Sequence, residues 1–189
     1  EIGASFAPHG ILISPLPHMT FAAETGATFA ENAIAKALAV AKHTGQVSIG
    51  DDSGLCVDAL DGRPGVHSAR YAGSPTSDAA NNETLLRELE GTKRDNRGAR
   101  FVCVLAGASP NGDVETVEGT AAGTILTSIR GNHGFGYDPL FFLPTVGKTM
   151  AELSAMEKDA VSHRGRAVRL VIPVLQRFLK KMPAPPSPH

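Results

Sequence analysis

The pair Asn111-Gly112 lies between two runs of strand-forming residues and predicts a tight β-hairpin. Residues 100–106 are the strand expected before this turn, and residues 114–117 are the strand expected after it. A turn this short can only join neighbouring antiparallel strands. The local sequence alone therefore predicts that these two strands pair. Residues 120–125 are expected to form a third antiparallel strand.

Helix signals lie on both sides of this hairpin. Thr28 is a candidate N-cap, and Glu31 follows it at the spacing of a capping box. An alanine-rich run then predicts a helix to about His43, where Thr44-Gly45 supplies a stop. Ser77 precedes a second predicted helix.

A third, long amphipathic helix is predicted to begin at Ser162, and Pro173 is expected to kink or split it. Short apolar runs at residues 11–13 and 47–50 are predicted strands. Because helices and strands alternate while the middle of the chain contains hairpins, the sequence favours an α/β or α+β fold with a mixed sheet.

The length and charge of the chain narrow its class. Its 189 residues suit one domain, or one domain with two lobes, and 18 basic against 19 acidic residues leave a net charge of −1. This balance argues against a nucleic-acid binder with a broad basic face. No apolar run approaches the ~20 residues of a membrane span. Two cysteines, Cys56 and Cys103, form neither a disulfide framework nor a zinc site, and both are expected to be buried.

The first candidate site is Asp51-Asp52-Ser53-Gly54, which follows the predicted strand at residues 47–50. Ligands gather at the carboxyl ends of strands in α/β folds. Two adjacent carboxylates are costly unless a cation or hydrogen bonds compensate them, and Mg²⁺ would fit, with Ser53 free to meet a phosphate. The alternative is an ordinary Asp-rich turn in which a carboxylate caps the next segment.

The second candidate site is the loop at residues 134–139, Gly-Phe-Gly-Tyr-Asp-Pro. Its glycines let the backbone approach a ligand, and Phe135 offers a flat face on which a nucleobase can stack. Asp138 could hydrogen-bond the edge of that base. The alternative is that Phe135 and Tyr137 attach the loop to the core.

The third candidate site combines Lys158 with His163 and Arg164 near the predicted start of the last helix. Cations at a helix N-terminus oppose the macrodipole, so helix stability does not explain them. A bound anion would reconcile the two. The alternative is a charged helix start exposed to solvent.

Taken together and in order, these motifs resemble the inosine/xanthosine triphosphate pyrophosphatase family, also called Ham1-like or non-canonical purine NTP pyrophosphatases. The resemblance extends over residues 1–180. The matching segments are residues 28–32, 51–55, 65–73, 135–139, 147–149, 151–153 and 162–164.

The resemblance implies an elongated, two-lobed α/β fold with a long twisted mixed sheet flanked by helices and a nucleotide cleft between the lobes. The domain would cover residues 1–181, followed by a disordered Pro-rich tail over residues 182–189. It also implies a cytoplasmic homodimer that removes non-canonical nucleotides from the nucleotide pool. Such an enzyme hydrolyses ITP, dITP and XTP to the monophosphate and pyrophosphate with Mg²⁺.

The resemblance also implies roles for individual residues. Asp52 would be the catalytic proton acceptor and would hold Mg²⁺, assisted by Glu24. The substrate-binding residues would be Ser53, Phe135, Gly136, Tyr137, Asp138, Lys158, His163 and Arg164.

One family feature has no counterpart here. The family opens with a strand and a phosphate-binding loop of the type Thr-x-Asn-x-x-Lys, whereas this sequence begins at Glu1, where the first helix of the family would start. We therefore expect either that further residues precede Glu1 or that this form binds phosphate poorly. The alternatives to the family function are a Maf-like pyrophosphatase acting on other modified nucleotides, a non-catalytic nucleotide-binding form and a plain structural domain.

Overall fold

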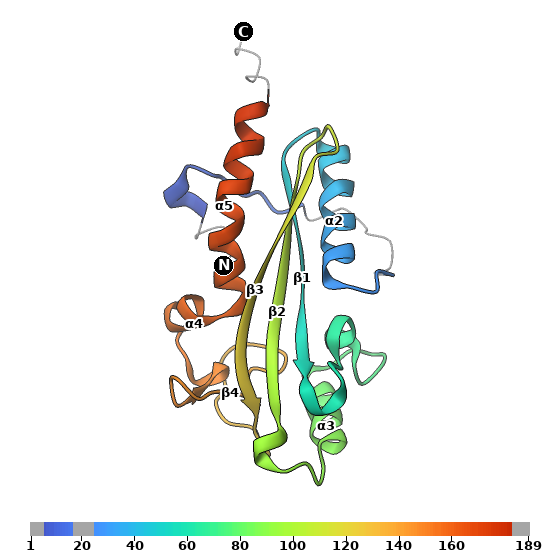
Figure 1. Cartoon of the computed structure of the whole chain (residues 1–189), viewed down its shortest axis with the longest axis vertical. Helices are drawn as coiled ribbons and strands as arrows, with labels where there is room; N and C mark the ends of the chain where they lie inside the picture. Colours follow the sequence, from blue (N-terminus) through green and yellow to red (C-terminus); the bar gives the residue numbers. More distant parts are fainter. Residues whose placement is uncertain (1–5, 17–24, 183–189) are drawn as a thin grey trace.

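Three long, twisted antiparallel strands form the centre of the fold in the computed structural model, which describes residues 6–16 and 25–182 (Figure 1). Two short strands extend the sheet beyond the third long strand, in the order β1-β2-β3-β4-β5. The strands are β1 (Ser48–Val57), β2 (Gly98–Ala108), β3 (Val114–Ile125), β4 (Phe141–Leu143) and β5 (Lys148–Thr149).

The predicted hairpin at Asn111-Gly112 is confirmed. It joins β2 to β3, and the amide of Ser109 donates to the carbonyl of Asp113 across the turn at 2.8 Å. The prediction of separate strands over residues 114–117 and 120–125 is wrong, because β3 is continuous. Gly119 does not interrupt it, since it pairs with Cys103 in an unbroken ladder.

Two other strand predictions differ from the structure. The strand expected over residues 47–50 continues to Val57, so Asp51-Asp52-Ser53-Gly54 lies inside β1 and not in a turn after it. The strand expected over residues 11–13 is absent, and Leu12 there is 92% exposed. The sheet was expected to be mixed, but every pairing between the described strands is antiparallel.

The three predicted helices are present, and a short fourth one precedes the last. Their predicted caps are confirmed: Thr28, Ser77 and Ser162 each accept a hydrogen bond from a first-turn backbone amide. Pro173 does not split the last helix, because it lies on the exposed side, where water can satisfy the carbonyl left without a partner. The helices are α2 (Phe29–Thr44), α3 (Asp78–Glu88), α4 (Ala155–Val161) and α5 (His163–Lys181).

Helices α2 and α5 cover opposite faces of the upper part of the sheet in Figure 1. The alternation of side chains along β2 makes this possible: Val104 packs with the buried alanines of α2, and its neighbour Leu105 packs with α5. The apolar stripe of α5 consists of Ala167, Val168, Val171, Ile172, Val174, Leu175 and Phe178.

A second core fills the lower part of the molecule, where α3 and the segments around β4 pack against the sheet (Figure 1). Leu55 and Phe101 continue the α5 side of the sheet into this core, where they join Tyr137 and Phe141. The chain therefore has two packed regions along one sheet, and the α/β class is confirmed. No helix in the described part of the chain is long and apolar enough to cross a membrane. The tail predicted to be disordered lies outside the described residues from 183 onward.

Short 3₁₀ helices connect these elements. The most consequential is η3 (Gly65–Arg70), which covers the outer edge of the second half of β1: the amide of Leu55 donates to Ser68 Oγ at 2.9 Å. The others are η1 (Ala7–His9), η2 (Asp58–Leu60), η4 (Arg94–Asn96) and η5 (Met150–Glu152).

Candidate active site

The neighbouring carboxylates of Asp51 and Asp52 lie on opposite faces of β1. Asp52 pairs across the sheet with Val104 on the α2 side, and Asp51 pairs with Leu105 on the α5 side. Successive side chains of a strand point to opposite faces, so the two carboxylates do not form one joint ligand. In the described sheet β1 is the edge strand, and η3 covers the outer edge of its second half only.

Asp52 lies in a polar contact with α2. Asn32 Nδ2 donates to its Oδ2 at 3.0 Å, and Lys36 Nζ lies 3.2 Å from its Oδ1. The residue is only 7% exposed, so these partners compensate a carboxylate that is largely removed from water. Asn32 and Lys36 were not among the predicted site residues. Residues four apart lie on one face of a helix, so their spacing could have indicated that both side chains face the same site.

Asp51 is paired with the first turn of α5. Arg164 Nε donates to Asp51 Oδ2 at 3.1 Å, and Ser53 Oγ donates to Asp51 Oδ1 at 2.9 Å. Arg164 Nη2 also lies 3.4 Å from Ser53 Oγ. Burial opposes the charge of Arg164, but the carboxylate of Asp51 outweighs it, so the pKa of Arg164 lies above its ordinary value.

The loop predicted to bind a base is held by Asp138. Its Oδ2 accepts from the backbone amide of Phe135 at 2.9 Å and forms an ion pair with Lys158. Gly134 has φ +79°, and a Cβ there would lie 2.1 Å from Asp138 Oδ2, so only glycine allows this closure. Asp138 is 2% exposed and turned inward, which makes it a support of the loop.

Tyr137 and Gly136 tie the same loop to the rest of the lower core. Tyr137 is buried, and its hydroxyl donates to the carbonyl of Ser68 at 2.9 Å. The amide of Gly136 donates to Asp78 Oδ2 at 2.6 Å, and its carbonyl accepts from Asn82 Nδ2 at 2.8 Å. The alternative that the aromatic residues attach the loop to the core is therefore correct for Tyr137.

Phe135 behaves differently, because its side chain is 57% exposed. Two cations border its ring: Lys158 Nζ lies 4.6 Å from the ring centroid, and Arg164 Cζ lies 5.8 Å from it. An exposed aromatic face bordered by the donors of Lys158 and Arg164 suits stacking of a flat ligand better than it suits core packing.

His163 points away from this exposed face. Its ring is buried and stacks on Phe101 with centroids 4.8 Å apart and an interplanar angle of 14°. Burial, helped by the charges of Arg164 and Lys158, lowers the pKa of His163 to about 3. The imidazole is therefore neutral at physiological pH, and its buried Nδ1 has no hydrogen-bond partner within residues 6–16 and 25–182.

The expected cation cluster at one helix N-terminus is divided between two helices. Lys158 belongs to α4, whereas His163 and Arg164 form the first turn of α5. Asp138 and Asp51 neutralise Lys158 and Arg164 respectively. A bound anion is therefore not needed to explain why these cations are tolerated beside the helix dipole.

The donors for a metal ion are few in the described residues. No group of three His, Cys, Asp or Glu side chains within residues 6–16 and 25–182 is arranged to hold one. Glu24, the second predicted ligand, lies outside the described part of the chain. A single carboxylate at Asp52 nevertheless suits Mg²⁺, which proteins commonly bind through one or two carboxylates together with water and substrate phosphates.

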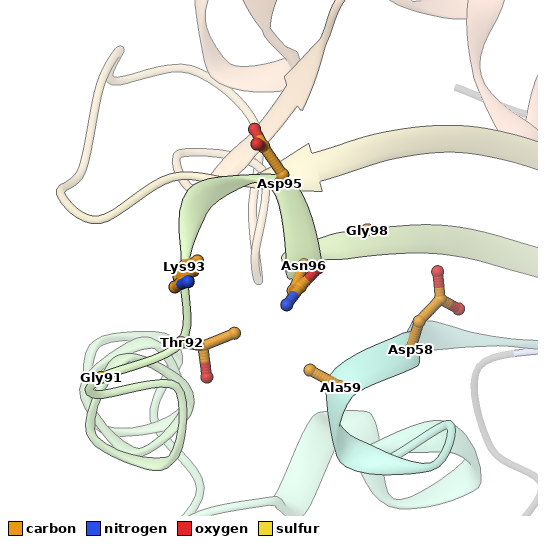
Figure 2. A pocket seen from close by; sticks show the side chains of 8 residues that line it. All are labelled: Asp58, Ala59, Gly91, Thr92, Lys93, Asp95, Asn96 and Gly98. Atoms are coloured by element: carbon orange, nitrogen blue, oxygen red, sulfur yellow. The ribbon is translucent and has the colours of Figure 1, made fainter.

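A hollow of about 770 Å³ lies at the end of the sheet where β1 ends and β2 begins. Figure 2 shows Asn96, Thr92 and Ala59 around it, with Asp58 at its margin. None of the predicted site residues lines it. The candidate active site is therefore the polar cluster around Asp51, Asp52 and Arg164, and this hollow is separate from it.

Comparison with known proteins places this arrangement in a family. Residues 1–174 match the sequence profile of the Ham1 family. The chain belongs to the Ham1 family. A dITP/XTP pyrophosphatase from Desulforamulus reducens is 52% identical over 168 residues, covering 89% of this chain and 84% of that protein. One from Geobacillus kaustophilus is 52% identical over 171 residues, with the same coverage of each chain, 89% and 84%.

Solved Ham1 structures share the fold. The Staphylococcus aureus Ham1 protein superposes with a TM-score of 0.79 at 46% sequence identity, covering 85% of this chain and 82% of that one. A nucleoside-triphosphatase / dITP/XTP pyrophosphatase from Mycobacterium abscessus gives a TM-score of 0.72 at 47% identity, covering 84% and 83%. Both similarities support the α/β fold described above.

Proposed function

We propose that this Ham1 protein hydrolyses non-canonical purine nucleoside triphosphates, namely ITP, dITP and XTP, to the monophosphate and pyrophosphate. The names of its relatives support this reaction. The observation that carries the proposal is the exposed ring of Phe135, which lies between Lys158 and Arg164 on a loop that Asp138 holds in place. These groups suit a flat purine, which can stack on the exposed ring.

The substrate would cross the outer edge of β1. Its purine would stack on Phe135 on the α5 side, where Arg164 and Ser53 lie close together. Its phosphates would extend around the edge strand toward Asp52 and Lys36 on the α2 side. This path explains why the predicted residues lie on both faces of one strand.

Asp52 would accept a proton from the water that attacks the α-phosphorus. The new bond joins the water oxygen to that phosphorus, the bond from the α-phosphorus to its bridging oxygen breaks, and pyrophosphate leaves. Lys36, 3.2 Å from Asp52, favours the ionised carboxylate that this role requires. Asp52, with Glu24, would hold Mg²⁺, which would neutralise charge on the phosphate oxygens.

Selection at position 6 of the purine would use hydrogen-bond donors. The guanidinium of Arg164 donates only, and it lies beside the Phe135 ring, whereas His163 is turned away from this face. A 6-oxo group accepts such a bond, whereas the 6-amino group of adenine would leave a buried donor without a partner. We also propose that the enzyme is a cytoplasmic homodimer.

The test is pyrophosphate release from ITP, dITP and XTP compared with ATP and GTP, with and without Mg²⁺. The proposal requires Mg²⁺-dependent release from the first three nucleotides and little from the other two. Release from modified pyrimidine or methylated nucleotides instead would favour a Maf-like activity. Binding of ITP without any release would favour a non-catalytic nucleotide-binding protein.

A further inference from the structure

Asp51 has no part in the reaction proposed above, yet both of its carboxylate oxygens are engaged. Arg164 approaches them through two nitrogens: Nε lies 3.1 Å from Oδ2, and Nη2 lies 3.4 Å from Oδ1. Ser53 Oγ donates to Oδ1 at 2.9 Å, and Cys103 Sγ lies 3.8 Å from Oδ2. Groups from β1, β2 and α5 therefore converge on one side chain.

We propose that Asp51 is a positioning residue that orients the guanidinium of Arg164 beside the ring of Phe135, so that the site receives a purine nucleotide in one geometry. The inference rests on the proposed function, because it assigns Arg164 to the nucleotide. A guanidinium held through two nitrogens by two oxygens cannot rotate freely, whereas one held at a single point can. The distance of 5.8 Å between Arg164 Cζ and the Phe135 ring is then set by Asp51.

The surroundings of Asp51 favour this role. Asp51 and Arg164 have equally accessible side chains, each 29% exposed, so the pair is only partly screened by water. Cys103 is fully buried, and burial raises the pKa of its thiol to about 12. The thiol thus remains protonated and does not compete with Asp51 for Arg164.

The alternative is that Asp51 binds Mg²⁺ together with Asp52. The geometry opposes this role, because the two carboxylates point to opposite faces of β1. A positioning residue and a metal ligand predict different results on substitution, so an experiment can separate them.

The experiment is a double-mutant cycle on Asp51 and Arg164. ITP binding is measured by calorimetry in EDTA, and turnover is measured as a function of ITP and Mg²⁺ concentrations. Asp51→Asn should weaken ITP binding and raise KM about 10-fold while kcat changes about 2-fold at most. In an Arg164→Ala background the same change should have no further effect, because Asp51 acts through Arg164. A further 10-fold loss in the double mutant, or an altered Mg²⁺ dependence in Asp51→Asn, would overturn the proposal.

Arg164→Lys provides a second variant that keeps the positive charge and removes the two-point contact. Its loss of ITP binding should equal that of Asp51→Asn. Asp58→Asn is the matched control, because Asp58 forms an exposed ion pair with Arg100 at 3.4 Å and is not among the site residues. It should leave ITP binding and turnover unchanged.

A readout without nucleotide separates failure of this inference from failure of the proposed function. The Nε–H resonance of Arg164, assigned by its loss in Arg164→Lys, should be sharp and slow to exchange in the wild-type protein and should broaden in Asp51→Asn. An unchanged resonance would refute the positioning role whatever the substrate. Absence of pyrophosphate release from the wild-type protein would refute the proposed function alone.

Discussion

A Cβ atom on Gly50 would lie 2.1 Å from the carbonyl oxygen of Ala33, so the backbone of α2 lies directly on β1. The opposite face repeats this relationship, because a Cβ on Gly119 would lie 2.2 Å from the carbonyl oxygen of His163. Helices α2 and α5, which carry Lys36 and Arg164, are thus each brought against the sheet at a glycine. The distances of Lys36 and Arg164 from β1 depend on these two contacts.

Substituting either glycine should destabilise the protein. Gly50→Ala or Gly119→Ala forces the helix backbone away from the strand, and we expect a loss of about 2–3 kcal/mol in the free energy of unfolding. For a chain of this size the melting temperature should fall by roughly 5–10 °C. Gly98→Ala is the control, since its Cβ would meet only the flexible side chain of Asp58. Equal melting temperatures for all three variants would contradict the close-contact argument.

Asp52→Asn should abolish most turnover and leave folding intact. The amide keeps the size of the carboxylate and can still accept from Asn32, but it cannot take up a proton from water. We expect kcat to fall at least about 100-fold, the usual scale for loss of a general base. Pyrophosphate release measures the effect, and circular dichroism verifies the fold. Turnover near that of the wild type would remove Asp52 from the mechanism.

Phe135→Ala should weaken nucleotide binding without a cost in stability. The ring is more than half exposed, so its removal leaves no cavity. Stacking of a base on an aromatic side chain contributes about 1–3 kcal/mol, so the affinity for ITP should fall by about 10-fold or more. Calorimetry and a melting curve give the two quantities. Unchanged affinity would mean that the base binds elsewhere.

Arg97→Met should be among the most destabilising substitutions of a charged residue. The buried guanidinium donates to the carbonyls of Leu89, Ile125 and Leu126 at 2.9–3.0 Å, and burial lowers its pKa. Methionine would leave these carbonyls without their donor, at a cost of about 3 kcal/mol. Urea denaturation should show a lower midpoint with an unchanged slope. Arg100→Met, at an exposed position, should change the midpoint little.

His163 should make the protein less stable as the pH falls below about 6.5. There the unfolded chain takes up a proton that the folded protein does not bind until about pH 3, the level to which burial lowers the pKa of His163. Unfolding is therefore favoured by about 1.4 kcal/mol per pH unit from this group alone. His163→Gln should make the dependence shallower between pH 6 and 4. An imidazole resonance of His163 that titrates near pH 6.5 would contradict the expectation.

Local chemistry made much of this fold predictable. Thr28, Ser77 and Ser162 were identifiable as caps because a side-chain oxygen before a helix satisfies a free amide of its first turn. The turn at Asn111-Gly112 was identifiable because few residue pairs adopt its backbone angles. These features depend on contacts a few residues apart.

The remaining features depend on contacts between distant segments. The sequence Asp51-Asp52 suggests a turn, because uncompensated carboxylates are disfavoured in a strand. In the structure, Lys36 of α2 and Arg164 of α5 compensate the two charges. Pro173 reads as a helix breaker, but its exposed position allows α5 to continue. Arg97 carries no local sign of burial, yet three carbonyls at the ends of α3 and β3 enclose it. A single sequence does not encode these long-range partners in any local pattern.

The opposed carboxylates of β1 make this strand far more sensitive to insertion or deletion than to substitution. Loss or gain of one residue among positions 48–50 would move every later side chain to the other face. Asp51 would then meet Lys36, Asp52 would meet Arg164, and the proton acceptor would lie on the side of the purine. Gain of two residues would restore the faces but displace both carboxylates by about 6.6 Å along the strand. The chemistry of the site is therefore encoded in the length of a strand as well as in the identity of its residues.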